Sequence, residues 1–144
     1  DSFRGSKTVT RTYETISEAQ KKANSLKTMM QQGRPKSEIK EYIEDNLLMI
    51  QLGGAGQEGG GPAAKMMERL NQAQTWEDQV LGSPFEDMPA TEKIGNLQQI
   101  WLKKVELANK FMDQVHEQMD KIEKGEIDPT DVANRATSSL PNNE

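Results

Sequence analysis

Residues 91–124 read TEKIGNLQQIWLKKVELANKFMDQVHEQMDKIEK and decide the fold class of this chain. Apolar side chains recur there at steps of three and four residues, which places them along one side of an α-helix. This main row contains Ile94, Leu97, Trp101, Val105, Ala108, Met112, Val115, Met119 and Ile122. At 1.5 Å of rise per residue, the row runs along about 50 Å of helix. A chain this polar does not easily cover an apolar row of that length with its own residues. We therefore predict that the helix packs against other polypeptides.

A second apolar row lies beside the first on the same predicted helix. Its members are Ile100, Leu107 and Phe111. Two rows make the buried arc wider than the seam of a two-stranded coiled coil, which favours a bundle of three or more helices. The spacing from Leu97 through Trp101 to Val105 adds a step of four and interrupts any strict heptad pattern. We therefore expect globular-style helix packing, with the twelve residues of the two rows as the predicted interface.

Composition limits the chain to one small core. The 144 residues carry a net charge of −5, 33% of them are apolar, and the mean hydropathy is −0.84. These values lie on the polar side for a globular domain, in which apolar residues including Gly reach about 45–50%. We expect a single domain, or a small domain with extended arms, around a thin interior.

The rest of the chain predicts an all-α protein in which a helical hairpin precedes the long helix. Residues 1–12 lack a helical period and contain β-prone side chains, so we expect an extended or disordered arm there. Residues 13–52 show helical spacing on both sides of Gly33 and Pro35, which predicts a hairpin of two helices. Bundle-like packing of this hairpin with the long helix completes the predicted fold.

A glycine-rich stretch separates the hairpin from the rest of the chain. Residues 53–61 carry few side chains that could hold a backbone path, so we predict a flexible linker between two helical units. Residues 62–125 contain a third helix, a connector with two prolines, and the long helix. Residues 126–144 are expected to form a short helix and a polar tail.

Charge is distributed unevenly along the sequence. Residues 1–36 hold eight Lys and Arg against three acids, whereas residues 37–144 hold ten against twenty, so the two parts carry +5 and −10. The predicted electrostatic arm contains Arg4, Lys7, Arg11, Lys21, Lys22 and Lys27. A basic segment beside an acidic body can bind nucleic acid, an anionic surface or the acidic body of a neighbouring copy. The acidic pI of about 5.0 makes nucleic acid the less favoured partner.

The sequence offers no catalytic constellation. It contains no cysteine and one histidine, His116. His116 and Asp120 stand one helical turn apart, but a zinc-protease motif needs a second histidine where Asp120 stands. The glycines before Pro62 also lack the Gly-Lys-Ser/Thr sequence of a phosphate-binding loop. We therefore predict a non-enzymatic protein with no catalytic residue, no cofactor and no metal site.

These observations favour a structural or assembly protein that self-associates through its long amphipathic helix, as a subunit of a filament, ring or particle. One alternative is a helical binding adaptor or export chaperone that receives an amphipathic helix of another protein. A further alternative is a nucleic-acid-associated packaging factor that uses the basic amino-terminal segment.

Localisation is the least constrained property of the sequence. No apolar run approaches the roughly 20 residues of a membrane span, and no apolar core of a secretory leader is visible. The lack of Cys and the abundance of Asn and Gln are compatible with a secreted or virion component. Composition alone leaves the compartment open.

Overall fold

The computed structural model describes residues 2–54, 60–82 and 85–138, with side chains from residue 7 to residue 137 inside these ranges. The described residues form six helices and no strand. The helices are α1 (Ser2–Gln31), α2 (Lys36–Asp45), α3 (Leu47–Gly53), α4 (Pro62–Leu81), α5 (Ala90–Glu123) and α6 (Pro129–Ser138). The predicted all-α fold class is confirmed.

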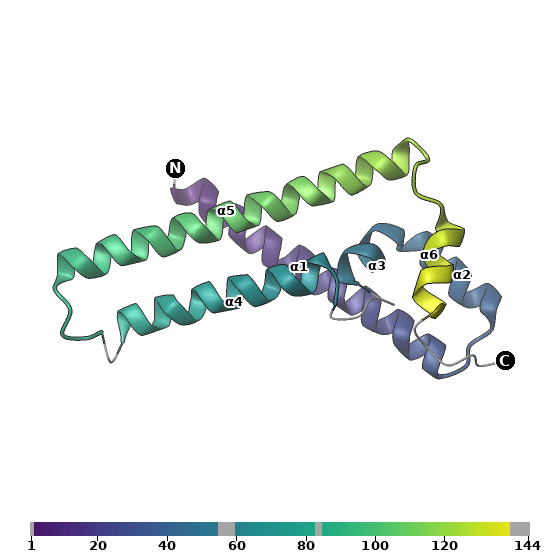
Figure 1. Cartoon of the computed structure of the whole chain (residues 1–144), viewed down its shortest axis with the longest axis horizontal. Coiled ribbons are helices and arrows are strands. Elements are labelled where there is room, and N and C mark those ends of the chain that lie inside the picture. Colours follow the sequence, from purple (N-terminus) through teal and green to yellow (C-terminus); the bar gives the residue numbers. More distant parts are fainter. Residues whose placement is uncertain (1, 55–59, 83–84, 139–144) are drawn as a thin grey trace.

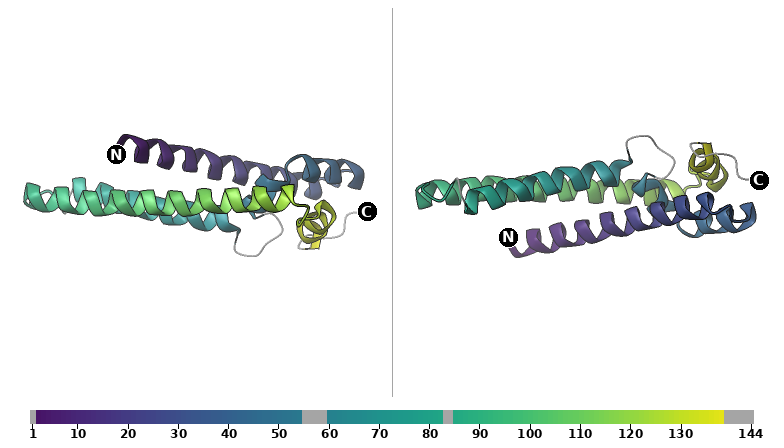
Figure 2. Two further views of the ribbon diagram at one scale, coloured as in Figure 1. Left: turned by 90° about the horizontal axis from the view of Figure 1, so that it is seen from above. Right: turned by 90° about the horizontal axis from the view of Figure 1, so that it is seen from below.

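The helices form two layers. Figure 1 shows α4 and α5 side by side as an antiparallel hairpin, and Figure 2 shows α1 in a second layer across one face of this hairpin. α3 packs against α1, and α6 packs against α2 and α3. α5 packs against α4, α1 and α3, in agreement with the predicted bundle. The loop-connected end of the α4–α5 hairpin extends beyond the first residues of α1 (Figures 1 and 2).

Two hydrophobic clusters form the core, and α1 contributes to both. Ile16 in the first half of α1 lies in a cluster with Leu70 of α4 and Phe111 of α5, here called the hairpin cluster. Leu26 in its second half lies in a cluster with Ile43 of α2 and with α6. Because α1 is divided between the two clusters, it covers part of the hairpin and leaves its loop-connected end outside the second layer.

The expectation of an extended or disordered arm at residues 1–12 is wrong for the described part of that segment. α1 begins at Ser2, and Val9 and Thr12 are buried one turn apart in line with Ile16. The Thr12 hydroxyl donates a hydrogen bond of 3.5 Å to the carbonyl of Ala108 on α5. Packing against α5 therefore outweighs the local β-preference of the Thr and Val residues in this segment.

The single second helix predicted in the hairpin is two helices in the structure. The helix breaks at Asn46, which has φ −126° and ψ 26°, and its side-chain amide donates a 3.0 Å hydrogen bond to the carbonyl of Tyr42. A side chain that bonds to the preceding turn competes with the regular helical pattern. The hairpin itself is present, and the Tyr42 hydroxyl donates a 3.2 Å hydrogen bond to the carbonyl of Lys22 on α1.

The glycine-rich stretch brings its two described ends together. Gly54 has φ +80°, and a Cβ at Gly61 would lie 2.5 Å from the Cα of Gly54. Leu52 before the stretch and Ala63 after it are both buried in the hairpin cluster. The two helical units predicted on either side of this stretch therefore share one core. Of the flexible linker predicted at residues 53–61, Gly53 belongs to α3, and residues 55–59 lie outside the described residues, as does the predicted polar tail at residues 139–144.

Close backbone approach joins α3 to α1 at Gly53. A Cβ at Gly53 would overlap the carbonyl oxygen of Ala19 and would lie 2.7 Å from the Cβ of Ala23. Ala19 and Ala23 are four residues apart and face α3 from one side of α1. Three small residues thus allow the two helices to approach each other more closely than larger side chains would permit.

A buried ion pair joins the two helices of the hairpin. The ammonium of Lys104 lies 2.6 Å from Oε2 of Glu77 and donates a second hydrogen bond of 2.7 Å to Oε1 of Gln74. The Lys104 side chain is 6% exposed and the Glu77 side chain 28% exposed. Removing an ammonium from water costs several kcal/mol unless acceptors compensate for the lost hydration. The two acceptors on α4 therefore favour one alignment of α5 along α4.

We expect Gly53→Ala to lower the free energy of unfolding by about 1–3 kcal/mol, because the added methyl group forces α3 away from α1. Gly95→Ala is the matched control, since nothing lies within 4 Å of a Cβ at Gly95 in α5. There the higher helix propensity of Ala should raise stability by about 0.5–1 kcal/mol. Urea unfolding followed by circular dichroism measures both. Equal stabilisation by the two substitutions would contradict the close packing at Gly53.

We expect Lys104→Met to destabilise the protein by about 1–3 kcal/mol, less than for a fully buried pair because water reaches part of Glu77. The double variant Lys104→Met with Glu77→Met should recover most of this loss, because no uncompensated charge remains between the helices. A double-mutant cycle by urea unfolding gives the coupling energy. Additive effects of the two substitutions would show that the pair does not act as a unit.

Candidate interaction surface

The connector between α4 and α5 is tied to the start of α5. The backbone N–H of Met88 donates to the carbonyl of Phe85 at 3.0 Å, and the Lys93 ammonium donates to the carbonyl of Glu86 at 3.3 Å. The Asn96 side-chain amide also donates to the Met88 sulfur, 3.4 Å away. These bonds hold the described part of the connector against the first turns of α5 and make the hairpin end a defined surface.

The structure divides the twelve residues of the predicted interface into three groups. Those buried within the chain's own core are Leu107, Ala108, Phe111 and Val115. Those that are half-buried are Leu97, Ile100, Trp101, Val105, Met112 and Ile122. Ile94 is 56% exposed and Met119 is 45% exposed. The prediction that the whole row serves a contact between chains is therefore wrong for the four buried residues, because α1, α3 and α4 cover the middle of α5.

Large apolar side chains remain exposed at the loop-connected end of the hairpin. The exposed fraction is 47% for Trp76, 59% for Leu81, 56% for Ile94 and 66% for Leu102. Ile94 alone among them belonged to the predicted interface. Sequence reasoning missed the other three because helical spacing shows which side of a helix a residue occupies, whereas exposure depends on which parts of the hairpin the other helices cover.

The side of the hairpin that faces α1 continues past the start of α1 as an apolar surface. Trp101 and Ile94 stand seven and fourteen residues before Ala108, so all three lie on one side of α5. This is the side that faces α1, because the carbonyl of Ala108 accepts the hydrogen bond from Thr12. Leu81 stands one turn beyond Glu77 on α4. We call the surface formed by Leu81, Ile94, Leu97 and Trp101 the tip face.

α1 packs against α4 on this same side, where Tyr13 of α1 lies near Glu77 of α4. Burial raises the pKa of the Tyr13 hydroxyl above its ordinary value, and the negative charge of Glu77 raises it further. Tyr13 also packs against the hairpin cluster. Glu77 is therefore close to the covered part of this side, and Leu81 follows it toward the hairpin end.

The opposite side of the hairpin end carries a shallow apolar groove of about 360 Å³. Its lining includes Trp76 and Val80 of α4, Phe85 of the connector, and Ile100 of α5. Polar side chains, among them Lys103, complete its rim. We call it the Trp76 groove. The two tryptophans of the chain thus lie on opposite sides of the hairpin end.

Acidic side chains surround this end of the hairpin. Residues 76–93 contain five acids and one base, a net charge of −4. Glu77 is engaged by Lys104. The other four acids are exposed and comprise Asp78, Glu86, Asp87 and Glu92. The hairpin end therefore combines an apolar surface with a negative rim.

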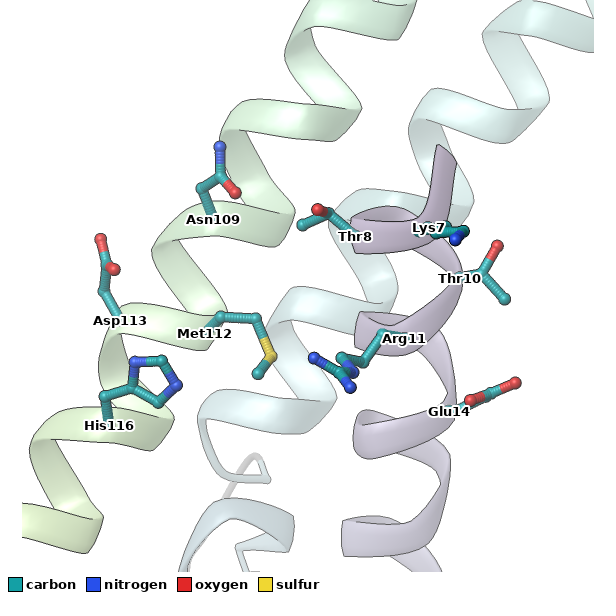
Figure 3. A pocket seen from close by; sticks show the side chains of 9 residues that line it. All are labelled: Lys7, Thr8, Thr10, Arg11, Glu14, Asn109, Met112, Asp113 and His116. Atoms are coloured by element: carbon teal, nitrogen blue, oxygen red, sulfur yellow. The ribbon is translucent and has the colours of Figure 1, made fainter. Parts of the chain in front are cut away.

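A polar groove of about 960 Å³ lies between the first half of α1 and the second half of α5. Lys7 and Arg11 line it from α1, and Met112, Asp113 and His116 line it from α5 (Figure 3). Figure 3 shows the Met112 side chain reaching from α5 toward Arg11. The groove holds the basic groups of Lys7 and Arg11 beside the second half of α5.

The predicted electrostatic arm is part of α1 and not a separate segment. Lys7, Arg11, Lys21 and Lys27 are exposed. Lys22 is half-buried, and its ammonium lies 3.9 Å from Oε1 of Glu18. The Arg4 side chain lies outside the described side chains. The helix therefore holds these charges on a rigid element, with acids interspersed among them.

The described residues also bear on metal binding and on membrane insertion. No group of three or more His, Asp and Glu side chains is arranged to hold a metal ion there. Within the same residues, no helix has the length and apolar character needed to cross a membrane. Comparison of the chain with protein-family models, with curated proteins and with solved structures found no match.

Proposed function

We propose that this chain is a non-enzymatic structural or assembly protein that self-associates through the loop-connected end of its α4–α5 hairpin. The observation that carries the proposal is the exposure of Leu81 and Ile94, 59% and 56%, on the side of the hairpin that α1 covers elsewhere. Exposed large apolar residues that gather on one side of a helical hairpin are typical of protein–protein contacts. Three of the four tip-face residues, Ile94, Leu97 and Trp101, belong to α5. α5 is therefore the helix through which the copies associate.

The size of the tip face indicates a contact of modest affinity. Covering Leu81 and Ile94 contributes about 1–2 kcal/mol for each side chain. Two copies that cover each other supply this twice, and the half-buried Leu97 and Trp101 add to it. The loss of translational and rotational freedom offsets much of the gain. We therefore expect a dissociation constant in the micromolar range or weaker.

Charge favours another copy of this chain as the partner. The first 36 residues carry +5 and the remaining 108 carry −10. Basic side chains on α1 and acidic side chains at the hairpin end lie on separate surfaces, so neighbouring copies can pair unlike charges. Such pairing raises the rate of encounter and selects the orientation more than it raises affinity.

A second candidate function is that of an adaptor for a different protein, and the Trp76 groove favours it. Trp76, Phe85 and Ile100 line an apolar groove wide enough for side chains of an amphipathic helix. This candidate predicts that the purified chain is a monomer or a dimer and that the groove receives an amphipathic helix of another protein. A nucleic-acid-associated role is weaker because Glu14 and Glu18 interrupt the basic surface of α1.

We expect the molar mass from light scattering to rise above 16.2 kDa as the concentration of the purified chain increases. The series should run from about 1 to 500 µM, which brackets the expected affinity. Ile94→Asp, which places a charge on the tip face, should raise the dissociation constant about tenfold or more. Gln114→Asp, at an exposed position in the second half of α5, is the matched control and should behave as the wild type.

Circular dichroism of each variant distinguishes lost association from lost folding. Ile94 is more than half exposed, so its replacement should leave the helical signal unchanged. A wild-type chain that remains monomeric over the whole series would overturn the proposed function and favour the adaptor.

A further inference from the structure

We infer that the tip face is covered by a second, antiparallel copy of this chain, related by a two-fold axis near Leu97. In this pair the acidic hairpin end of each copy lies against the basic start of α1 of the other. The inference rests on the proposed function, because it specifies the partner and the geometry of the same surface. A two-fold arrangement uses one surface on both copies, so every contact is made twice.

The second layer leaves the loop-connected end of the hairpin uncovered (Figure 2). α1 packs on the hairpin through Thr12 and Ile16. Figure 2 shows that the hairpin continues beyond the first turns of α1. Leu81 and Ile94 of the tip face are more than half exposed there. A helical hairpin laid there in line with α1 would extend the second layer over the rest of α5. The hairpin end of a second copy has the required apolar surface and length.

An antiparallel pair of α5 helices matches apolar residues of the two copies in register. When Leu97 faces Leu97 of the second copy, residues equally far before and after it face each other. Ile94, three residues before Leu97, then comes close to Trp101 of the second copy, four residues after. The apolar residues of the two tip faces therefore contact one another. The axes of helices packed in this way lie about 8–10 Å apart.

The same register pairs unlike charges. The acidic connector enters α5 at Ala90, seven residues before Leu97, and Ala90 comes level with Lys104 of the second copy, seven residues after. Lys104 stands one turn before Ala108, where Thr12 anchors the first half of α1. The acidic end with a net charge of −4 over residues 76–93 thus approaches the part of α1 that carries Lys7 and Arg11.

Charge reversal tests this pairing in solution. Glu86→Lys with Asp87→Lys replaces two acids of the connector by bases and brings the net charge of residues 76–93 from −4 to zero. Lys7→Glu with Arg11→Glu makes the start of α1 acidic. Each double variant alone loses the attraction between unlike charges at both ends of the pair, so its dissociation constant should rise about tenfold or more. An equimolar mixture of the two variants restores unlike charges at both ends. It should associate within about threefold of the wild type.

A control variant with the same charge change identifies non-specific effects. Lys40→Glu with Lys65→Glu changes the net charge as much as Lys7→Glu with Arg11→Glu, at exposed positions of α2 and α4. It should leave association within about twofold of the wild type. Added salt of about 1 M should reduce the difference between reversed and wild-type chains, because it screens exposed charges.

Cross-linking tests the two-fold axis directly, because the chain contains no cysteine. Leu97→Cys places identical thiols opposite each other, within the roughly 4.4–6.8 Å between Cα atoms that a disulfide requires. Oxidation with copper phenanthroline should give a covalent dimer on a non-reducing gel. Gln114→Cys, far from the axis on α5, is the matched control and should remain largely monomeric.

The outcomes separate this inference from the proposed function. A wild-type monomer at every concentration overturns both. In another outcome the wild type self-associates and Ile94→Asp weakens this, while mixing the two charge-reversed variants gives no rescue and Leu97→Cys forms no covalent dimer. That result keeps the proposed function and overturns the antiparallel pair. Trp76→Asp blocks the Trp76 groove and leaves the tip face as the contact. If the molar mass of this variant grows past twice 16.2 kDa, the antiparallel pair is also overturned, because a closed pair of tip faces stops at two copies.

Discussion

α1 has to cover two hydrophobic clusters at once, and the rest of the structure depends on this division. Its first half buries Ile16 against α4 and α5, and its second half buries Leu26 against α2 and α6. A helix shared in this way cannot also extend along the whole α4–α5 hairpin. The loop-connected end of the hairpin is therefore one layer thick, and Leu81 and Ile94 remain more than half exposed there.

The contact between α1 and α3 makes this division of α1 workable. Gly53 lies so close to Ala19 and Ala23 that a methyl group at Gly53 would overlap the α1 backbone. The close approach places Leu52 in the hairpin cluster, where Ala63 enters from the other side of the glycine-rich stretch. The glycines predict a flexible linker from the sequence, but in the structure they also allow close packing of helices. The lack of a side chain permits both flexibility and close approach.

Charged residues act differently inside the hairpin and at its end. Lys104 is buried between α4 and α5 and finds Glu77 and Gln74 as acceptors, so it favours one alignment of the two helices. The exposed acids at the hairpin end have water as an alternative partner, and their contribution to affinity is small. Their value to an assembly is selection of orientation. The proposed two-fold pair relies on apolar contact for affinity and on charge for geometry.

The amino-acid sequence by itself determined the helical class and several helix bounds. Pro62 and Gly82 delimit α4, and Gly125 follows α5, because proline and glycine limit helices through local backbone geometry. The tertiary structure decided which residues are covered. It made a helix of the segment around Val9, and it buried Phe111 while leaving Ile94 exposed. Helical spacing assigns these apolar residues to one side of a helix, whereas burial depends on the crossing of α1, which involves residues distant in sequence.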